Sequence, residues 1–487
     1  MLIVHWYRDD LVFQCVAEGF TSGVHGRDAV EVARGYLNEL VNRSMIIQCV
    51  EHVLRGPRGD HISYRVHDMV LDLILSRSTE ENFLCVVQNL QSIGMRQQYK
   101  ARRLSLQFDG RSLVESAARI SLMHVRSLII FPWPLCSLGL LELRALDDLD
   151  LTLIGKLFQL RYLCISGNYE RLQLPKEISG IQHLEALKIV SFGLSSVPRD
   201  IVYLPALLYL QFPPGAVFPD GIGNLNRLHT LRKFDPSKQS VANICALGEL
   251  LNLRVPELWI NGVSFATKAA HIDALLSSLE KLIGSNMKNL SIISPDENMG
   301  HHDRWSSLCF PYSHLEQLDL SRIRFPRMPS WVCQLRTLSS LEIDVVELCQ
   351  DDVAAFAGLP ALAHLVLCAQ NVPRGGVVFS TGTTFMVLGY LRIPDVAAKV
   401  GITFEAGSMP QAEVLRFHLR ADYVMRHGVK LAGIEHLPKL KQVIVYVRFR
   451  GCAESERPVT KAAIQGAFDP HPSCSKIKTP KINQTYG

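Results

Sequence analysis

Residues 157–166 read Leu-Phe-Gln-Leu-Arg-Tyr-Leu-Cys-Ile-Ser, with apolar side chains at Leu157, Leu160, Leu163 and Ile165. The same spacing, apolar-x-x-apolar-x-x-apolar-x-apolar, returns many times along the chain. Its clear copies begin at Leu122, Leu143, Leu157, Ile181, Leu204, Tyr312, Leu335, Leu359, Phe385, Met409 and Leu437. Most neighbouring copies start 21 to 28 residues apart, although the step from Leu143 to Leu157 is 14. A period of this size indicates stacked repeats rather than separate globular domains.

The spacing is that of a leucine-rich repeat, in which the apolar-x-apolar pair forms a short strand with both apolar side chains pointing inward. One copy cannot bury its apolar face, so copies stack and their strands form a parallel sheet on the concave side. We therefore expect an α/β fold, a leucine-rich-repeat solenoid (horseshoe), over residues 101–450. The pattern weakens between residues 225 and 312, which we interpret as further repeats with loops. Residues 458–468 can form a helix that caps the last repeat, so we assign residues 451–487 to a cap helix and a loose tail.

The residue between the two strand apolar residues should point outward on the concave side. These outward positions are Cys164, Lys188, Gln211, Asp319, Glu342, Val366, Arg392 and Arg416. They mix charge, polarity and size, as expected of a surface that binds a protein partner. For each residue the alternative is an ordinary solvated strand position, because a few interface residues carry most of the binding energy.

Composition excludes several other classes of protein. The net charge is +5, and residues 1–100 carry ten basic and twelve acidic side chains, which argues against a DNA-binding head. The most apolar stretch, residues 128–141, is shorter than the roughly 18 residues that a membrane span needs. The twelve cysteines form no Cys-x-x-Cys pair, so we expect reduced thiols, a cytoplasmic protein and no metal site. His301, His302 and Asp303 are too few ligands for a metal and are expected in a solvated loop.

Residues 1–100 do not repeat, and their pattern is that of a winged-helix unit. Helices are expected at residues 9–17, with an apolar face, and at 28–42, with Asp28 as N-cap and a stripe of Val32, Tyr36 and Leu40. Strands at residues 45–50 and 62–66 should form a hairpin. A third helix at residues 68–76 should bury the apolar residues Met69, Val70, Leu73 and Ile74.

Ordered sequence blocks make this chain resemble a known family. Residues 11–20, Leu-Val-Phe-Gln-Cys-Val-Ala-Glu-Gly-Phe, are followed by the block at 35–46 and by Tyr-Arg-Val-His-Asp-Met-Val-Leu-Asp-Leu at 64–73. Residues 103–106, 125–128 and 154–163 continue the series into the repeats. Together they resemble the C-terminal part of the plant NB-ARC leucine-rich-repeat disease resistance proteins, of the cereal coiled-coil class. The resemblance implies that residues 1–100 are the winged-helix end of a truncated NB-ARC switch module.

The resemblance also implies a function in plant defence. In that family the repeats recognise a pathogen effector or a guarded host protein and regulate the NB-ARC switch. A Met-His-Asp motif closes the winged helix over ADP, and Val66, His67 and Asp68 occupy its place here. From the residues alone, His67 would be a histidine at a strand end and Asp68 a helix cap.

The sequence departs from the full family pattern in its phosphate-binding parts. It contains no Gly-x-x-x-x-Gly-Lys-Ser/Thr string, whose amides and lysine hold the phosphates of ADP or ATP. We therefore expect no cofactor, no autonomous nucleotide switch and no ATP hydrolysis. The chain can still bind an effector, a guarded protein or a full-length receptor of the family.

Two other readings stay open. One is a substrate-recognition repeat adaptor of a ubiquitin ligase, although such a protein has no reason to keep the order Val66-His67-Asp68. The other is a truncated gene product with no function. An enzyme is not expected, because Gly-x-Ser-x-Gly, His-Glu-x-x-His and paired-cysteine motifs are all missing from the sequence.

Overall fold

The computed structural model describes residues 6–23, 28–51, 61–81, 83–87, 102–106, 124–131, 149–151, 154–260, 268–294, 302–308, 314–393, 401–449, 456–466 and 483–485. Within these ranges, residues 156, 168, 192, 195, 286, 307, 373–375 and 430 are not described. Contacts between Cα atoms divide the chain into two units, Met1–Trp259 and Ile260–Gly487. The division falls within the repeats, and each unit is described by itself.

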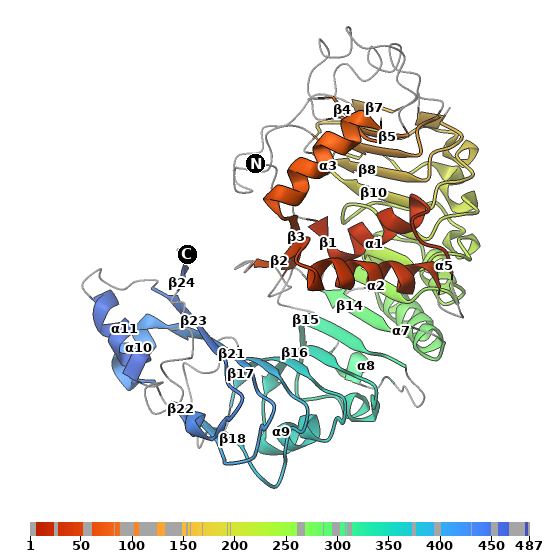
Figure 1. Ribbon diagram of the computed structural model, residues 1–487. Coiled ribbons are helices and arrows are strands. Elements are labelled where there is room, and N and C mark those ends of the chain that lie inside the picture. The colour runs from red at the N-terminus through yellow and green to blue at the C-terminus, as the bar shows by residue number, and fades with distance from the viewer. Residues whose placement is uncertain are drawn as a thin grey trace. The chain divides into compact units, whose positions relative to one another are not determined.

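The first unit contains a parallel sheet built from the repeat strands (Figure 1). Its strands are β4 (Cys85–Val87), β5 (Arg103–Leu106), β6 (Ser127–Ile130), β8 (Tyr162–Ser166), β10 (Ala186–Val190), β11 (Tyr209–Gln211), β12 (Thr230–Phe234) and β13 (Val255–Trp259). Register pairs the repeat leucines of neighbouring strands, such as Leu163 with Leu187 and Leu187 with Leu210. All three are fully buried. The prediction of a leucine-rich-repeat sheet is confirmed.

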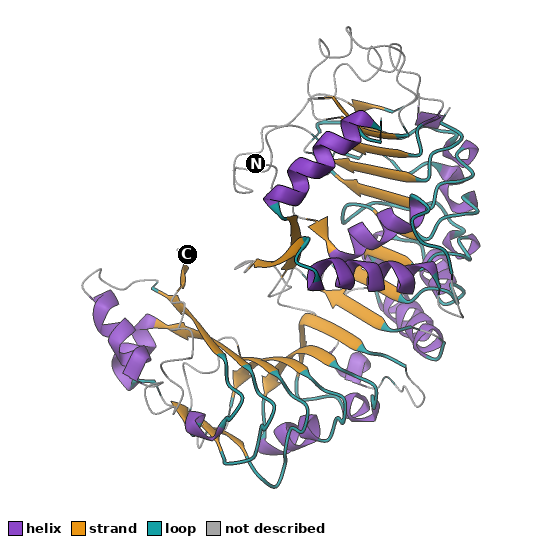
Figure 2. Cartoon of the chain, in the orientation of Figure 1, coloured by secondary structure: helices purple, strands orange, loops and turns teal. Residues whose placement is uncertain are grey.

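Short 3-10 helices and one α-helix lie in the connections between the later strands of this sheet (Figure 2). They are η4 (Ile178–Gly180), η5 (Arg199–Tyr203), η6 (Ile222–Asn224), η7 (Pro236–Lys238) and helix α5 (Val241–Leu247). A minor sheet pairs β7 (Leu149–Asp150) with β9 (Leu172–Gln173). Buried Asn243 accepts hydrogen bonds at Oδ1 from the backbone N–H groups of Gly221 and Ile222, which ties one repeat to the next.

The second unit repeats the same architecture. Its parallel strands are β14 (Asn289–Ile293), β15 (Gln317–Phe325), β16 (Ser340–Glu347), β17 (His364–Asn371), β19 (Tyr390–Ile393), β21 (Val414–Arg420), β23 (Gln442–Arg448) and β24 (Asn483–Thr485). The connections hold α7 (Ala269–Ile283), α8 (His302–Ser306), η8 (Ser330–Gln334), α9 (Gln350–Ala357), α10 (Ala421–His427), η9 (Ile434–His436), and the sheet of β18 (Val377–Phe379), β20 (Ile402–Phe404) and β22 (Leu431–Ala432).

The region with the weaker pattern contains repeats, as expected, but its connections are partly helical. Strands β12, β13 and β14 all lie between residues 225 and 312. The 15-residue helix α7 was not predicted. His302 and Asp303 lie in helix α8, so the expectation of a loop there was wrong, and His301 lies outside the described residues. At the C-terminus, helix α11 (Glu456–Gly466) confirms a helix near the predicted cap, with Ile464 buried.

The N-terminal elements form the predicted winged-helix arrangement. Strand β1 (Trp6–Tyr7) is followed by helices α1 (Arg8–Ala17) and α2 (Ala29–Asn42), then by β2 (Ile46–Glu51), β3 (His61–Val66) and helix α3 (Asp68–Glu80). The three strands form an antiparallel sheet in the order β1, β3, β2. The side chain of Asp28 accepts a hydrogen bond from the N–H of Glu31 at 2.8 Å, which confirms Asp28 as the N-cap of α2.

The predicted buried faces of α2 and α3 were wrong. Helix α2 buries Val30, Ala33 and Leu37, whereas Tyr36 from the predicted stripe is 56% exposed. On α3, Met69 is 77% and Leu73 61% exposed. Periodicity locates the helices but does not say which side meets the rest of the fold. None of the described helices is both long and apolar enough to cross a membrane.

Candidate functional site

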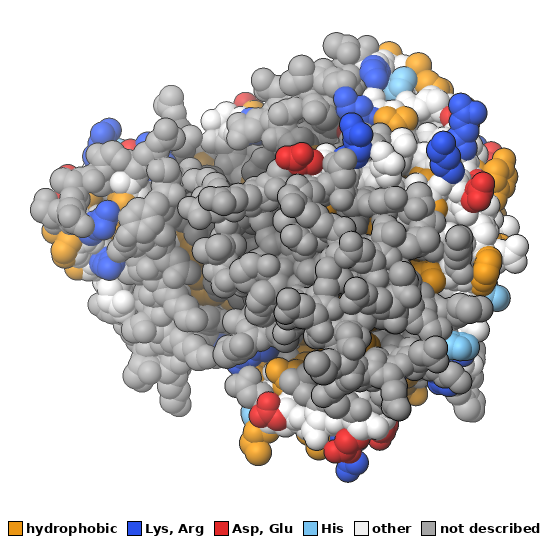
Figure 3. Space-filling model, turned by 90° about the horizontal axis from the view of Figure 1, so that it is seen from above, with side chains coloured by type: hydrophobic (Ala, Val, Ile, Leu, Met, Phe, Trp, Pro, Cys, Tyr) orange, Lys and Arg blue, Asp and Glu red, His pale blue; other side chains and the backbone are white. Residues whose placement is uncertain are grey.

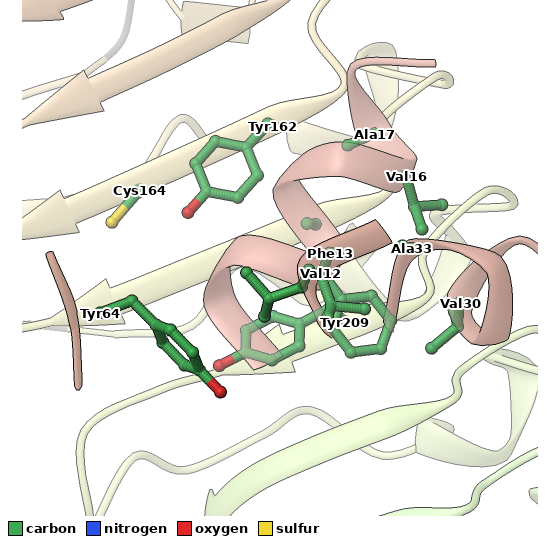
Figure 4. Close-up of a cluster of buried hydrophobic side chains, with 12 residues drawn as sticks. Val12, Phe13, Val16, Ala17, Val30, Ala33, Tyr64, Tyr162, Cys164 and Tyr209 are labelled. Carbon is green, nitrogen blue, oxygen red and sulfur yellow. The ribbon is translucent and has the colours of Figure 1, made fainter. Parts of the chain in front are cut away.

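Helix α1 lies on the face of the first unit's parallel sheet that carries the outward positions such as Lys188, and we call this face of each sheet the strand face. Its apolar residues share a core with the repeat strands there (Figure 4). Val12 and Phe13 from α1 are both 1% exposed and pack with Tyr162 of β8 and Tyr209 of β11. The ring of Phe13 lies 4.9 Å from that of Tyr209 and 5.5 Å from that of His229. Contacts between aromatic rings stabilise the fold beyond what the burial of their apolar surface contributes. We call this set of contacts the winged-helix interface.

A buried ion pair lies within the winged-helix interface. Asp10 of α1 is 2% exposed, and its Oδ2 lies 2.5 Å from Nζ of Lys188 on β10. The hydroxyl of Tyr209 lies 3.1 Å from Asp10 Oδ1 and 2.6 Å from Oε1 of Gln211. Burial by itself lowers the pKa of Lys188, but the charge of Asp10 raises it above its ordinary value. Both charges therefore depend on each other, because a buried charge that loses its partner is strongly destabilising.

Further ion pairs surround this core. Asp9 lies 3.8 Å from Arg232 of β12, and Arg254 lies 2.5 Å from Asp28 and 3.5 Å from Glu31. The helices supply the carboxylates and the repeats supply the guanidinium groups. This complementarity fixes how the winged helix sits on the strand face.

A third contact joins the end of α1 to the first repeats. The carboxylate of Glu18, whose side chain is 1% exposed, lies 2.7 Å from Nε of Arg103 on β5. The guanidinium group of Arg103 also lies 3.9 Å from the ring centre of Phe83 and 4.9 Å from that of Phe20. Burial raises the pKa of Glu18, while Ser127 and Arg103 act to lower it.

The structure corrects the expectation for Cys164, Lys188 and Gln211, which were predicted to face an outside partner. Cys164 is 5% and Gln211 6% exposed, and Lys188 is paired with Asp10. Burial raises the pKa of the Cys164 thiol to about 11, so this cysteine is an inert apolar group. Helix α1 of the same chain already occupies the strand face at these three positions.

The other five predicted residues come together on the strand face of the second unit. Strand register aligns Asp319, Glu342, Val366, Arg392 and Arg416 on the neighbouring strands β15, β16, β17, β19 and β21. Val366 is 2% and Arg416 3% exposed, and the other three are half-buried. Burial and the nearby charge of Asp319 raise the pKa of Glu342 to about 8, although Arg392 acts in the opposite direction. We call these five residues the outward row; their role in binding stays a prediction.

Val66, His67 and Asp68 lie where β3 ends and α3 begins. His67, rather than Asp68, is the N-cap, since its Nδ1 accepts a hydrogen bond from the N–H of Met69 at 3.3 Å. The imidazole is exposed. With Nδ1 engaged, Nε2 is the ring atom that can donate to a phosphate. One imidazole alone does not hold a nucleotide, and the expectation that this chain binds no cofactor stays a prediction.

Sequence reasoning missed the residues that make the winged-helix interface. Asp10, Arg232 and Arg254 were not singled out, although the acidic balance of residues 1–100 against the basic remainder was a usable signal. The space-filling view in Figure 3 shows Lys and Arg side chains in blue and Asp and Glu side chains in red on the face of the molecule that it draws. Among the described residues, no group of three or more His, Cys, Asp or Glu side chains could hold a metal ion.

Comparison with known proteins matches both parts of the chain. A family model described as "Leucine-rich repeat region" matches residues 110–477, and one described as "Disease resistance protein Winged helix domain" matches residues 4–74. The rice disease resistance protein RGA5 is 34% identical over 96% of this chain and 42% of its own length. Rice Pik-2 is 26% identical over 74% of this chain and 38% of its own length. The chain thus spans about two fifths of these relatives.

A solved leucine-rich-repeat protein of Leptospira interrogans is 15% identical with a TM-score of 0.44, over 82% of this chain and all of that chain. The fold of repeats and winged helix, the ordered sequence blocks and the curated relatives all indicate the same family. The chain belongs to the leucine-rich-repeat disease resistance proteins of plants and carries their winged helix domain ahead of the repeats.

Proposed function

We propose that this chain works as the regulatory and recognition part of a plant immune receptor. The repeats of the first unit hold the winged helix, and the strand face of the second unit binds a pathogen effector or a guarded host protein. The observation that carries this proposal is the buried pair of Asp10 and Lys188. In this pair, α1 of the same chain covers the strand face of the first unit at Lys188. In the second unit, strand register brings the charged residues of the outward row together on neighbouring strands.

In this proposal the winged-helix interface regulates the NB-ARC switch. A partner that binds the repeats shifts the switch only if it binds one state of the receptor more tightly than the other. Separating α1 from the repeats would expose the buried ring of Phe13 to water, which favours the docked state. The chain can also dock on a full-length receptor of the family.

The proposal includes no catalysis and no tightly bound nucleotide. In the proposal, His67 of the Met-His-Asp-like motif would sense a phosphate through Nε2, because Nδ1 accepts a hydrogen bond from the N–H of Met69. Without a P-loop string in the sequence, ADP or ATP binding by the chain alone should be very weak and ATP turnover should not exceed a buffer control. We also propose a cytoplasmic location, because the twelve cysteines form no Cys-x-x-Cys pair and are expected to be reduced.

A genetic complementation experiment tests the defence role. Plants that lack the gene should become more susceptible to at least one pathogen strain, and the unaltered gene should restore resistance. A gene carrying Asp319→Lys and Arg392→Glu should produce normal protein levels without restoring resistance. A matched control is Arg336→Glu with Glu435→Lys, since both residues are exposed outside the outward row. Full resistance with the outward-row variant would refute recognition by this face, and unchanged susceptibility without the gene would refute the defence role.

A further inference from the structure

The outward row of the second unit changes sign along the sheet. Asp319 and Glu342 are neighbours on β15 and β16, and we call them the acidic pair. Arg392 and Arg416 are neighbours on β19 and β21, and we call them the arginine pair. Val366 on β17 separates the two pairs. Each pair places like charges directly opposite each other on adjacent strands, an arrangement that is unfavourable by itself.

The acidic pair is held in place by hydrogen bonds. Asp319 accepts from the hydroxyl of Ser291 at 3.0 Å and from the N–H of Ser321 at 3.0 Å, as well as from the Ser321 hydroxyl. Glu342 faces Asp319 on β15, Asp344 on its own strand, Cys368 on β17 and Arg392 on β19. Burial and the charge of Asp319 raise the pKa of Glu342 and so favour its neutral form. An added cation would favour its ionised form.

The arginine pair is set among aromatic rings. The guanidinium group of Arg416 lies 5.6 Å from the ring of Tyr390 and 5.7 Å from that of Tyr446. Tyr390 in turn stacks on His364 at 4.0 Å with an angle of 7°. Among the described residues, Nε of Arg392 is buried without a hydrogen-bond partner. A buried donor of this kind gains from an acceptor brought by a ligand.

Strand geometry fixes the distance between the two pairs. The order β15, β16, β17, β19, β21 puts their midpoints three strand spacings apart, or about 14 Å at about 4.8 Å per spacing. A segment that crosses the strands in an extended conformation advances about 3.3 Å per residue. It covers this distance in about four residues.

We propose that the strand face of the second unit binds an extended segment of a protein partner that carries a basic and an acidic residue about four positions apart, the basic one against the acidic pair and the acidic one against the arginine pair. This inference rests on the proposed recognition function and names the chemistry of the partner. A nucleic acid or an anionic membrane does not fit, because the acidic pair would repel it. Complementary charges chiefly give an interface its register and specificity.

Synthetic peptides provide the probe. Fluorescein-labelled 12-residue Gly/Ser peptides would carry Lys and Glu four positions apart, in either order, or Lys and Lys, or Glu and Glu, at the same positions. Binding to the full chain is measured by fluorescence anisotropy at low salt, because salt screens exposed charges. One of the mixed-charge peptides should bind about tenfold more tightly than either single-sign peptide, which is about 1.4 kcal/mol. Equal affinities for all peptides would overturn the inference.

Substitutions in the chain locate the contact. Arg392→Glu should lose the preference for the mixed peptide and gain affinity for the Lys/Lys peptide, whereas Arg336→Glu, an exposed control, should change neither. The same binding measured by isothermal titration calorimetry at pH 7, in buffers of different ionisation enthalpy, should show proton release as Glu342 ionises. If Arg392→Glu kept the preference for the mixed-charge peptide, or if binding released no proton, the placement of the peptide on the acidic and arginine pairs would be contradicted. The proposed defence function would still stand or fall on complementation alone.

Discussion

At the scale of single residues, Lys188 makes the most consequential contact of the first unit. Its side chain is 13% and that of Asp10 1% exposed, so removing the amine leaves a buried carboxylate without its cation. We predict that Lys188→Met lowers the free energy of unfolding by about 3–5 kcal/mol, measured by urea denaturation. The control Lys176→Met, at an exposed position, should stay within about 0.5 kcal/mol. Similar values for both variants would show that the pair is not buried as described.

Glu342 gives a prediction about pH. Its pKa is raised from 4.5 to about 8, so the folded state binds a proton that the unfolded state has lost. The corresponding stabilisation is complete below about pH 4.5 and disappears as the pH rises through about 8. We predict that Glu342→Gln reduces the drop in Tm of the second unit between pH 6 and pH 9. The same drop in both proteins, followed by calorimetry, would exclude this assignment.

His67 should matter little for stability in the isolated chain. It is exposed and makes one capping hydrogen bond at 3.3 Å. We predict that His67→Ala costs about 0.5–1 kcal/mol in chemical denaturation, and that His67→Asn recovers most of it because asparagine is a good N-cap. A loss above about 2 kcal/mol, without recovery by asparagine, would mean that His67 has a structural role beyond the cap.

At the scale of elements, α1 and α3 should behave in opposite ways. Phe13 of α1 is 1% exposed and contacts Tyr209 and His229, whereas Leu73 of α3 is 61% exposed. We predict a loss of about 3–5 kcal/mol for Phe13→Ala and less than about 0.5 kcal/mol for Leu73→Ala, by the same urea assay. A large effect at Leu73 would place α3 in a core that the structure does not show.

The elements also show what the sequence could and could not predict. The N-cap Asp28 and the hairpin of β2 and β3 follow from local chemistry, and the sequence predicted them. The buried stripe of α2 did not, because Val30, Ala33 and Leu37 are selected by surfaces far away in the sequence. Helix propensity and the period of apolar residues predict that a helix forms at these residues. The face that the helix buries is decided by the surface of the chain that packs against it.

At the scale of the whole molecule, the regular spacing of leucines predicted the repeat sheets of both units. It did not predict that α1 covers the strand face at Lys188, nearly two hundred residues along the chain. The contact joins residues 178 positions apart, so no local pattern encodes it. The acidic balance of residues 1–100 against the basic remainder was a signal for it that the sequence prediction did not use. The outward row was found from spacing, whereas its two like-charge pairs became apparent only from strand register.

Hydrogen exchange of the intact chain tests the central claim, that the repeats hold the winged helix. The account predicts that the backbone amides of α1 exchange as slowly as those of β10, that Lys188→Glu speeds exchange in α1, and that Lys176→Glu leaves it unchanged. Fast exchange throughout α1 in the unaltered protein, or protection of α1 that survives Lys188→Glu, would contradict it.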